Sequence, residues 1–201
     1  MTKAKRKRFD SRLVATLLVQ SLTMWPSCAQ VPFSTWALYN STYTVIYDSH
    51  TNLPRSAKWV LRPTDFAVKR PRAAKYFRQD KRLPKPRVKD LDYRNSGYMR
   101  GHLCPAGDRT KTMAMMKETF LMSNIAPMTA ALNCGRWADV ETECRRLAAL
   151  YDSVRIEVTT LILGADTLWI GGHKIAVPTA FTKECRRASN DSLLGVWFFT
   201  Q

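Results

Sequence analysis

The order of strand-like and helix-like segments most restricts the folds open to this chain. Residues 36–63 predict β-structure, because "TYTVIYD" alternates and is rich in β-branched and aromatic side chains, and "KWVLRP" is a second short apolar run. Residues 133–151 predict the clearest helix, with one apolar stripe made by Trp137, Val140, Cys144, Leu147 and Leu150. Strands return at "VRIEVTTLIL" and "SLLGVWFFT", and "WIGGHKIAVP" predicts a hairpin between them. We therefore expect an α+β domain around one core, which 201 residues are long enough to build.

The first 29 residues predict a cleaved signal peptide. A basic start, "KAKRKR", precedes an apolar run, "LVATLLVQSLTMW", that is too short to anchor in a bilayer, and "PSCAQ" offers small residues for cleavage after Ala29. We expect residues 1–29 to be this signal, residues 30–201 to be a single domain, and the protein to be secreted or periplasmic. A mitochondrial presequence and lipid attachment at Cys28 are the alternatives. No later stretch is apolar and long enough for a transmembrane helix, so we expect no stable membrane insertion.

A strong positive charge indicates the kind of partner. The chain has 32 Lys and Arg against 16 acidic residues, a formal net charge of +16. A positive charge this large usually indicates a polyanionic partner. Nucleic acid is the first candidate, and an anionic membrane surface is the second. Residues 64–94 carry much of the charge; three prolines and no steady period predict an extended surface loop there, and Tyr76, Phe77 and Tyr93 indicate that the loop packs against the domain. A membrane-surface protein would use the basic residues 69–89 of this loop.

Five cysteines, at positions 28, 104, 134, 144 and 185, show no C-x-x-C pair and give no support to a zinc site. Cleavage after Ala29 leaves an even number, which permits disulfides in an exported protein. Cys134 and Cys144 would lie about 15 Å apart on one continuous helix, too far to bridge. The sequence does not determine the pairing.

The stretch "GYMRGHLCPAGD", residues 97–108, holds one of only three histidines in a frame of three glycines and one proline. Such a frame can hold the His102 imidazole at one angle, which suits a general base. Asn133 and Glu141 lie eight residues apart along one side of the predicted helix, and an amide oxygen with a carboxylate suits Mg²⁺, whose remaining ligands are water. Arg100 adds a group that can fix a phosphate. Together these residues predict phosphodiester hydrolysis.

Each of these residues also has an ordinary explanation. His102 could be structural, Asn133 could cap the helix, and Glu141 and Arg100 could be solvated surface charges. Their combination in a strongly basic domain favours the functional interpretation.

Three blocks, "MRGHLCPAGD", "TFLMSNIAPM" and "LNCGRWADVE", closely resemble the DNA/RNA non-specific endonucleases, a family that includes secreted bacterial nucleases and mitochondrial endonuclease G. The resemblance runs from about Tyr43 to the C-terminus. It implies the ββα-metal, or His-Me finger, fold: a mixed antiparallel sheet with a metal-bearing helix. It further implies a metal-dependent endonuclease that hydrolyses DNA and RNA with little sequence preference. The partner is then nucleic acid as substrate, while an inhibitor protein and a homodimer are left open.

The resemblance also assigns roles within the motifs. His102 corresponds to the general base, Asn133 to the direct Mg²⁺ ligand (Mn²⁺ being the alternative metal), and Glu141 to the holder of metal-bound water. Arg100 and Asn124 correspond to residues that support the phosphate and the site. An upstream arginine of the family contacts the scissile phosphate; Arg72 is our candidate for it, and Arg70 is the second choice.

Three departures from the family pattern affect these expectations. Met99 stands where the family has Asp, "VTTLIL" replaces the usual Thr-Gly-Pro, and the sequence ends at "VWFFTQ", so we expect a fold shortened at its C-terminus. The alternative function is therefore that of a catalytically impaired relative that binds polyanions.

Overall fold

The computed structural model describes residues 34–71, 76–164 and 166–201. The predicted signal peptide, Cys28 and Arg72 lie outside the described residues. Within the described ranges, no helix combines the length and apolar character needed to cross a membrane.

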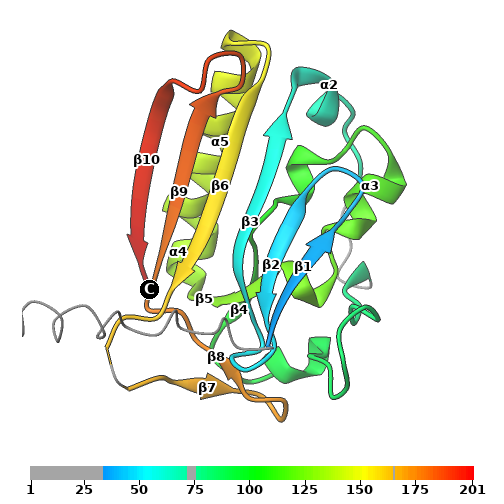
Figure 1. Cartoon of the computed structure of the whole chain (residues 1–201), viewed down its shortest axis with the longest axis vertical. Coiled ribbons are helices and arrows are strands. Elements are labelled where there is room, and N and C mark those ends of the chain that lie inside the picture. Colours follow the sequence, from blue (N-terminus) through cyan, green and yellow to red (C-terminus); the bar gives the residue numbers. More distant parts are fainter. Residues whose placement is uncertain (1–33, 72–75, 165) are drawn as a thin grey trace, which may run out of the picture. The chain divides into compact units, whose positions relative to one another are not determined.

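A six-stranded sheet forms the main layer of the domain of residues 34–201 (Figure 1). Its strands follow the order β1-β2-β3-β6-β9-β10, and each neighbouring pair is antiparallel. Their bounds are Thr35–Tyr39 for β1, Thr44–Asp48 for β2, Leu53–Leu61 for β3, Val154–Leu161 for β6, Ala180–Arg187 for β9 and Leu193–Thr200 for β10. In β6, every second side chain is buried, as the alternation of "VRIEVTTL" predicts.

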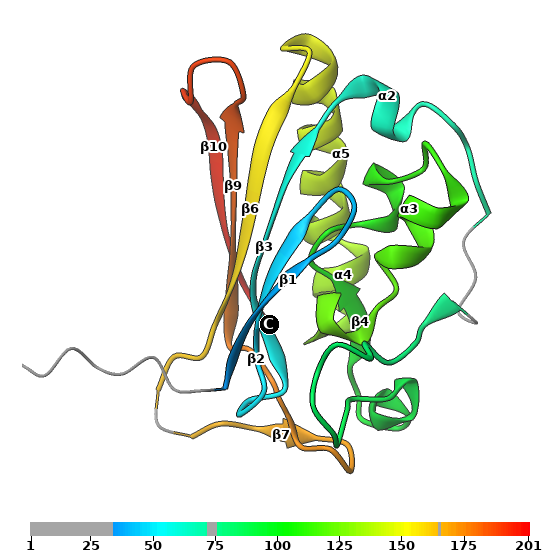
Figure 2. The same cartoon turned by 45° about the vertical axis from the view of Figure 1, so that its right-hand side comes forward.

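The helices gather on one side of this sheet (Figure 2). They are α2 (Pro63–Phe66), α3 (Met113–Glu118), α4 (Ala130–Cys134) and α5 (Arg136–Leu150). α5 buries Trp137, Val140, Cys144, Leu147 and Ala148. The chain order of these elements, strands first, then helices, then strands again, confirms the predicted α+β class.

The predicted helix over residues 133–151 is broken at Gly135. This residue has φ −103° and ψ −119°, which are not helical values, and its amide donates to the carbonyl of Ala131 at 3.1 Å. A Cβ at Gly135 would lie 2.6 Å from that carbonyl oxygen, so only glycine fits the break. Leu150, which the predicted stripe included, is the last residue of α5 and is exposed.

A second, two-stranded sheet carries the histidine. β4 (Met99–His102) pairs antiparallel with β5 (Ile125–Met128), and α4 follows β5 directly. At Gly101 a Cβ would lie 2.3 Å from the Sδ of Met128, so glycine leaves room for the Met128 side chain against β4. β4, β5 and α4 together make the ββα unit that the resemblance implies.

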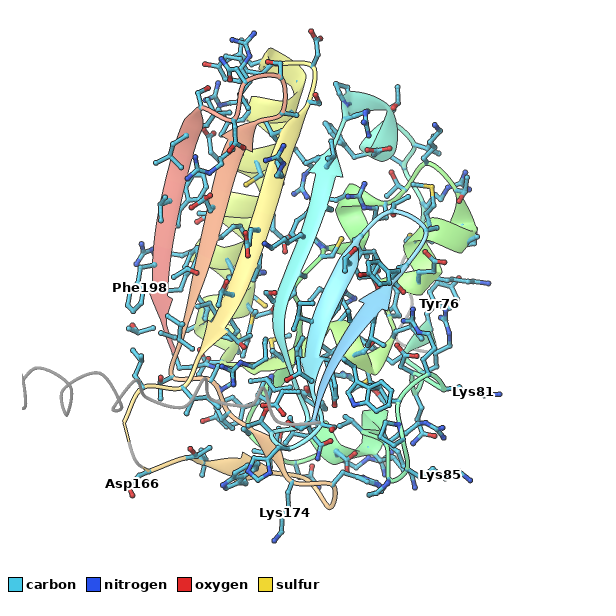
Figure 3. The ribbon with its side chains drawn as sticks, in the orientation of Figure 1. Tyr76, Lys81, Lys85, Asp166, Lys174 and Phe198 are labelled. Atoms are coloured by element: carbon cyan, nitrogen blue, oxygen red, sulfur yellow. The ribbon has the colours of Figure 1, made fainter. Side chains whose placement is uncertain are left out.

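The remaining elements are short. The turns η3 (Asp90–Tyr93), η4 (Ala106–Asp108) and η5 (Met122–Asn124) connect the layers, and β7 (Trp169–Ile170) and β8 (Ile175–Ala176) form the predicted hairpin. The described residues of the predicted loop, 64–71 and 76–94, are mostly irregular, as predicted. Lys81 and Lys85 extend from this loop into solvent (Figure 3), while Tyr93 is buried.

Asp80 fixes the basic loop to the rest of the domain. Its buried carboxylate accepts hydrogen bonds from Arg82 Nη2 at 2.6 Å and Ser123 Oγ at 2.7 Å, and Arg82 also donates to the carbonyl of Tyr39 at 2.8 Å. Burial by itself raises the pKa of Asp80, but the hydrogen bonds from Arg82 and Ser123 outweigh it and hold the pKa below its usual value.

Protonating or neutralising Asp80 should therefore destabilise the fold. Its pKa is lower in the folded than in the unfolded chain, so its contribution is fully present above about pH 4 and is lost as the pH falls through the folded-state pKa. We expect Asp80→Asn to lower the free energy of unfolding at pH 7 by about 3 kcal/mol and by clearly less at pH 3, measured by urea denaturation. The exposed control Asp139→Asn should cost less than about 1 kcal/mol. An equal loss for Asp80→Asn at both pH values would contradict this account.

Candidate active site

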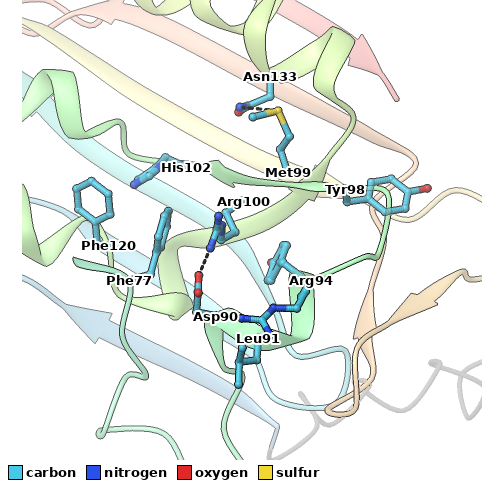
Figure 4. A pocket seen from close by; sticks show the side chains of 11 residues that line it. Phe77, Asp90, Leu91, Arg94, Tyr98, Met99, Arg100, His102, Phe120 and Asn133 are labelled. Atoms are coloured by element: carbon cyan, nitrogen blue, oxygen red, sulfur yellow. Dashed lines mark hydrogen bonds and ion pairs between the residues drawn. The ribbon is translucent and has the colours of Figure 1, made fainter. Parts of the chain in front are cut away.

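A cavity of about 590 Å³ opens beside β4 (Figure 4). It brings together three of the predicted residues, His102, Arg100 and Asn133, from β4 and α4. The other residues that line it are Phe77, Asp90, Leu91, Tyr93, Arg94, Tyr98, Met99 and Phe120.

His102 is the last residue of β4 and its ring is packed between aromatic side chains. The centroid of its imidazole lies 4.8 Å from that of Phe120 in an edge-to-face arrangement, and 5.5 Å from that of Phe77. Aromatic neighbours on two sides restrict rotation of the ring. The backbone of β4 pairs with β5 through Ile125, opposite His102, so both the main chain and the side chain are positioned.

Asn124 holds the backbone that follows the histidine. Its side chain is fully buried; Oδ1 accepts from the amide of Cys104 at 3.0 Å, and Nδ2 donates to the carbonyls of Cys104 and Thr119, both at 2.9 Å. These three bonds commit the amide to the backbone, and the residue does not line the cavity. The structure therefore places the Asn124 side chain behind the cavity wall, bonded to the backbone that follows His102.

Replacing Asn124 should destabilise this backbone. We expect Asn124→Ala to lower the free energy of unfolding by about 3 kcal/mol, because it leaves buried backbone groups of residues 104 and 119 without their partner. Urea denaturation checks this, with Asn190→Ala, on the exposed turn before β10, as a control that should cost less than about 1 kcal/mol. A loss no larger than that of the control would show that the three bonds contribute little.

Arg100 lies on the cavity wall between an acid and an aromatic ring. Its guanidinium forms an ion pair with Asp90 of η3, and its Cζ lies 4.8 Å from the centroid of Phe77 (Figure 4). About a third of the Arg100 side chain is exposed. The ion pair and the ring hold the guanidinium in the cavity.

Asn133 reaches the same cavity from α4. Its Nδ2 lies 3.7 Å from the Sδ of Met99, and the Sγ of Cys134 lies 3.7 Å from the same sulfur. A thioether is only a weak hydrogen-bond acceptor. Met99, which stands where the family pattern has Asp, therefore makes only a weak contact with the Asn133 side-chain amide. Thr129 caps α4, accepting from the amide of Leu132, so the capping explanation of Asn133 is wrong.

Glu141 lies on α5, beyond the break at Gly135, and does not line the cavity. The prediction that it shares one continuous helix with Asn133 is therefore wrong. Its Oε2 lies 4.0 Å from Nη1 of Arg145, which also bonds the buried Asp108 at 2.8 Å. Asp108 closes the glycine-framed stretch, so this ion-pair chain ties α5 to the segment after His102.

Arg70, the second choice for the upstream arginine, lies elsewhere. Its Nε donates to the carbonyl of Thr110 at 2.5 Å and its Nη2 to that of Lys111 at 2.9 Å. It lines a separate cavity with Phe66 and Arg145, so the structure does not place it with His102.

Sequence reasoning missed several residues of the cavity wall. Phe77 carried a signal, because an aromatic residue in a basic loop indicates packing against the domain. The sequence carried no such signal for three other wall residues, Asp90, Arg94 and Tyr98, because isolated polar residues in an irregular segment predict no contact.

A two-stranded ribbon and a helix, with a histidine and an asparagine lining one cavity, define the ββα-metal class of nuclease folds. The family model of the DNA/RNA non-specific endonucleases matches residues 29–199, and the chain belongs to this family.

Its relatives include the mitochondrial Endonuclease G of Homo sapiens, 33% identical over 155 residues that cover 71% of this chain and 51% of that protein. Nuclease 1, mitochondrial, of Schizosaccharomyces pombe is 35% identical over 157 residues, or 72% and 49% of the two chains. The chain thus spans about half the length of these curated relatives. A solved structure of the EndoG/EndoGI complex superposes with a TM-score of 0.74 at 27% identity, covering 82% of this chain and 73% of that one.

Proposed function

We propose that this chain is a metal-dependent endonuclease that hydrolyses phosphodiester bonds of DNA and RNA with little sequence preference. The observation that carries the proposal is the meeting of His102, Arg100 and Asn133 in one cavity. Membership of the endonuclease family and the net charge of +16 support a polyanionic substrate.

The residues fit a hard divalent cation such as Mg²⁺, with Mn²⁺ as the alternative. Asn133 offers an amide oxygen beside a cavity with room for water and a phosphate. Among the described residues no cluster of three His, Cys, Asp or Glu could hold a metal, which suits an ion that keeps most of its water and not zinc. We propose Asn133 as the direct ligand. We also propose that Glu141, which lies on α5 and not on the cavity wall, holds metal-bound water from behind that wall. When bound, the ion would neutralise negative charge that develops on the phosphate and the departing oxygen.

The protein's own side chains would perform the other steps. The imidazole of His102, held between Phe77 and Phe120, would accept a proton from the attacking water. Arg100 would turn one edge of its guanidinium from Asp90 toward a phosphate oxygen and fix the scissile group by charge-assisted hydrogen bonds. Such contacts read the backbone and not the bases, which is why we propose little sequence preference.

End-labelled DNA and RNA oligonucleotides of one sequence test the substrate range. We expect internal cuts at many positions of both. Release of mononucleotides from one end alone, or cutting at a single sequence, would contradict the proposal.

Met99 motivates the second candidate function, that of an impaired relative that binds polyanions. If its weak contact with Asn133 limits activity, Met99→Asp should raise the cleavage rate about tenfold at fixed Mg²⁺, because a carboxylate would accept from Nδ2 and orient the amide oxygen toward the metal. Met99→Leu serves as the control and should leave the rate within about twofold. Equal rates for Met99→Asp and wild type in a plasmid-nicking assay would show that the Met99 contact does not limit activity.

The relatives also bear on location and partners. Their names place several of them in mitochondria, which favours the mitochondrial alternative over secretion. The EndoG/EndoGI structure concerns EndoG inhibition, so we propose an inhibitor protein as a further partner of this chain.

A further inference from the structure

Helix α5 lies over the part of the sheet made by β6, β9 and β10, and it runs in the same direction as β9 (Figure 1). The indole of Trp137, near the start of α5, packs against Phe181 with ring centroids 5.4 Å apart. Nζ of Lys183 lies 3.8 Å from the Trp137 centroid. Residues 181, 183 and 185 alternate along β9 and are all buried, so they form one inward-facing row.

Two cysteines meet further along this contact. From Trp137 to Cys144 the helix rises about 10 Å. From the midpoint of Phe181 and Lys183 to Cys185 the strand also advances about 10 Å. The two spacings agree, so Cys144 faces Cys185 across the core. Both side chains are almost completely buried, 1% and 0% exposed, and both are free thiols in this structure, close enough for each to shift the pKa of the other.

We propose that Cys144 and Cys185 form a disulfide that covalently links α5 to β9. The other described cysteines have different neighbours: Cys134 contacts Met99, and Cys104 lies beside Arg109. Among the described cysteines, Cys144 and Cys185 are therefore the pair that we propose, which the sequence alone did not determine.

The oxidant would be a disulfide, either oxidised glutathione or the disulfide of an oxidoreductase. The thiolate of one cysteine attacks it, forming a mixed disulfide and releasing one thiol. The thiolate of the second cysteine then attacks the protein sulfur of that mixed disulfide, closes the Cys144–Cys185 bond and releases the second thiol. The two cysteines lose two protons and two electrons, and the oxidant gains them.

The bond would form while the chain folds and not afterwards. The neighbouring Cys185 thiol, together with burial, raises the pKa of the Cys144 thiol, and burial keeps a disulfide oxidant out of the folded core. The closed loop of about 40 residues would restrict the unfolded chain and raise the melting temperature by about 10 °C. This cross-link is independent of the proposed nuclease activity.

Peptide mapping tests the proposal directly. The full chain is refolded in a mixture of reduced and oxidised glutathione, alkylated, and digested with trypsin without reduction. We expect the peptides 137–145 and 184–186 to be joined, and to separate when dithiothreitol is added. Alkylation of both residues, or linkage of either to another cysteine, would overturn the proposal.

Thermal unfolding gives a second, independent readout. We expect reduction to lower the melting temperature of the wild type by about 10 °C. Cys144→Ala/Cys185→Ala also loses two buried side chains, so it should melt below the wild type, at one temperature that reductant does not change. Cys134→Ser, which changes an exposed thiol, should keep the full shift. A wild type whose melting is unaffected by reductant would overturn the proposal; if the double variant does not fold, the mapping of the wild type decides alone.

Discussion

His102→Ala should lower the rate of plasmid cleavage about a thousandfold while the protein stays folded. The imidazole is the proton acceptor that we propose, in the cavity that Arg100 and Asn133 also line. Its ring packs against Phe77 and Phe120 on the wall of an open cavity, so the loss of packing should be modest, with a melting temperature within a few degrees of wild type.

The control for this variant is His50→Ala, which removes an exposed imidazole in the turn after β2. It should cleave at the wild-type rate. Cleavage by His102→Ala at more than about a tenth of the wild-type rate, in a preparation free of other nucleases, would remove His102 from the chemistry.

Asn133→Ala should have the second-largest effect, a loss of about a hundredfold at fixed Mg²⁺. The amide oxygen is the proposed direct ligand of the metal, so its removal should weaken metal binding before anything else. We therefore expect the Mg²⁺ concentration for half-maximal cleavage to rise sharply, measured as a titration of the nicking rate.

Cys134→Ser is the matched control for Asn133→Ala, because Cys134 is the next residue of α4 and also contacts Met99. It should leave the Mg²⁺ titration unchanged. A loss of rate in Asn133→Ala with an unaltered Mg²⁺ midpoint would mean that Asn133 acts in some way other than holding the metal.

The sequence predicted those features that depend on local pattern. Residues close together in the sequence determine each of these features: the alternating burial in β6, the amphipathic face of α5 and the family motif around His102. The motif identified His102, Arg100 and Asn133, which the structure brings to one cavity.

The features that sequence reasoning missed depend on tertiary contacts. The helical spacing of apolar residues continues across Gly135, so the sequence pattern gives no sign of a break. The break goes with the close approach of the Ala131 carbonyl to Gly135, which apolar spacing does not reveal. Arg70 was chosen by its place in a proline-broken loop, where sequence separation sets no distance in space. Cys144 and Cys185 come together because of the way α5 packs on the sheet beside β9. The sequence of neither segment alone determines that packing.

The most direct test of the central claim is digestion of supercoiled plasmid by the purified chain with Mg²⁺, with a chelator, and with the chelator followed by excess Mg²⁺. We predict nicked and then linear and fragmented DNA with Mg²⁺, intact plasmid with the chelator, and recovery of cleavage when Mg²⁺ is restored. Plasmid that is bound in a salt-sensitive manner but stays supercoiled in Mg²⁺ would contradict a catalytic His102–Asn133 site and leave polyanion binding as the function.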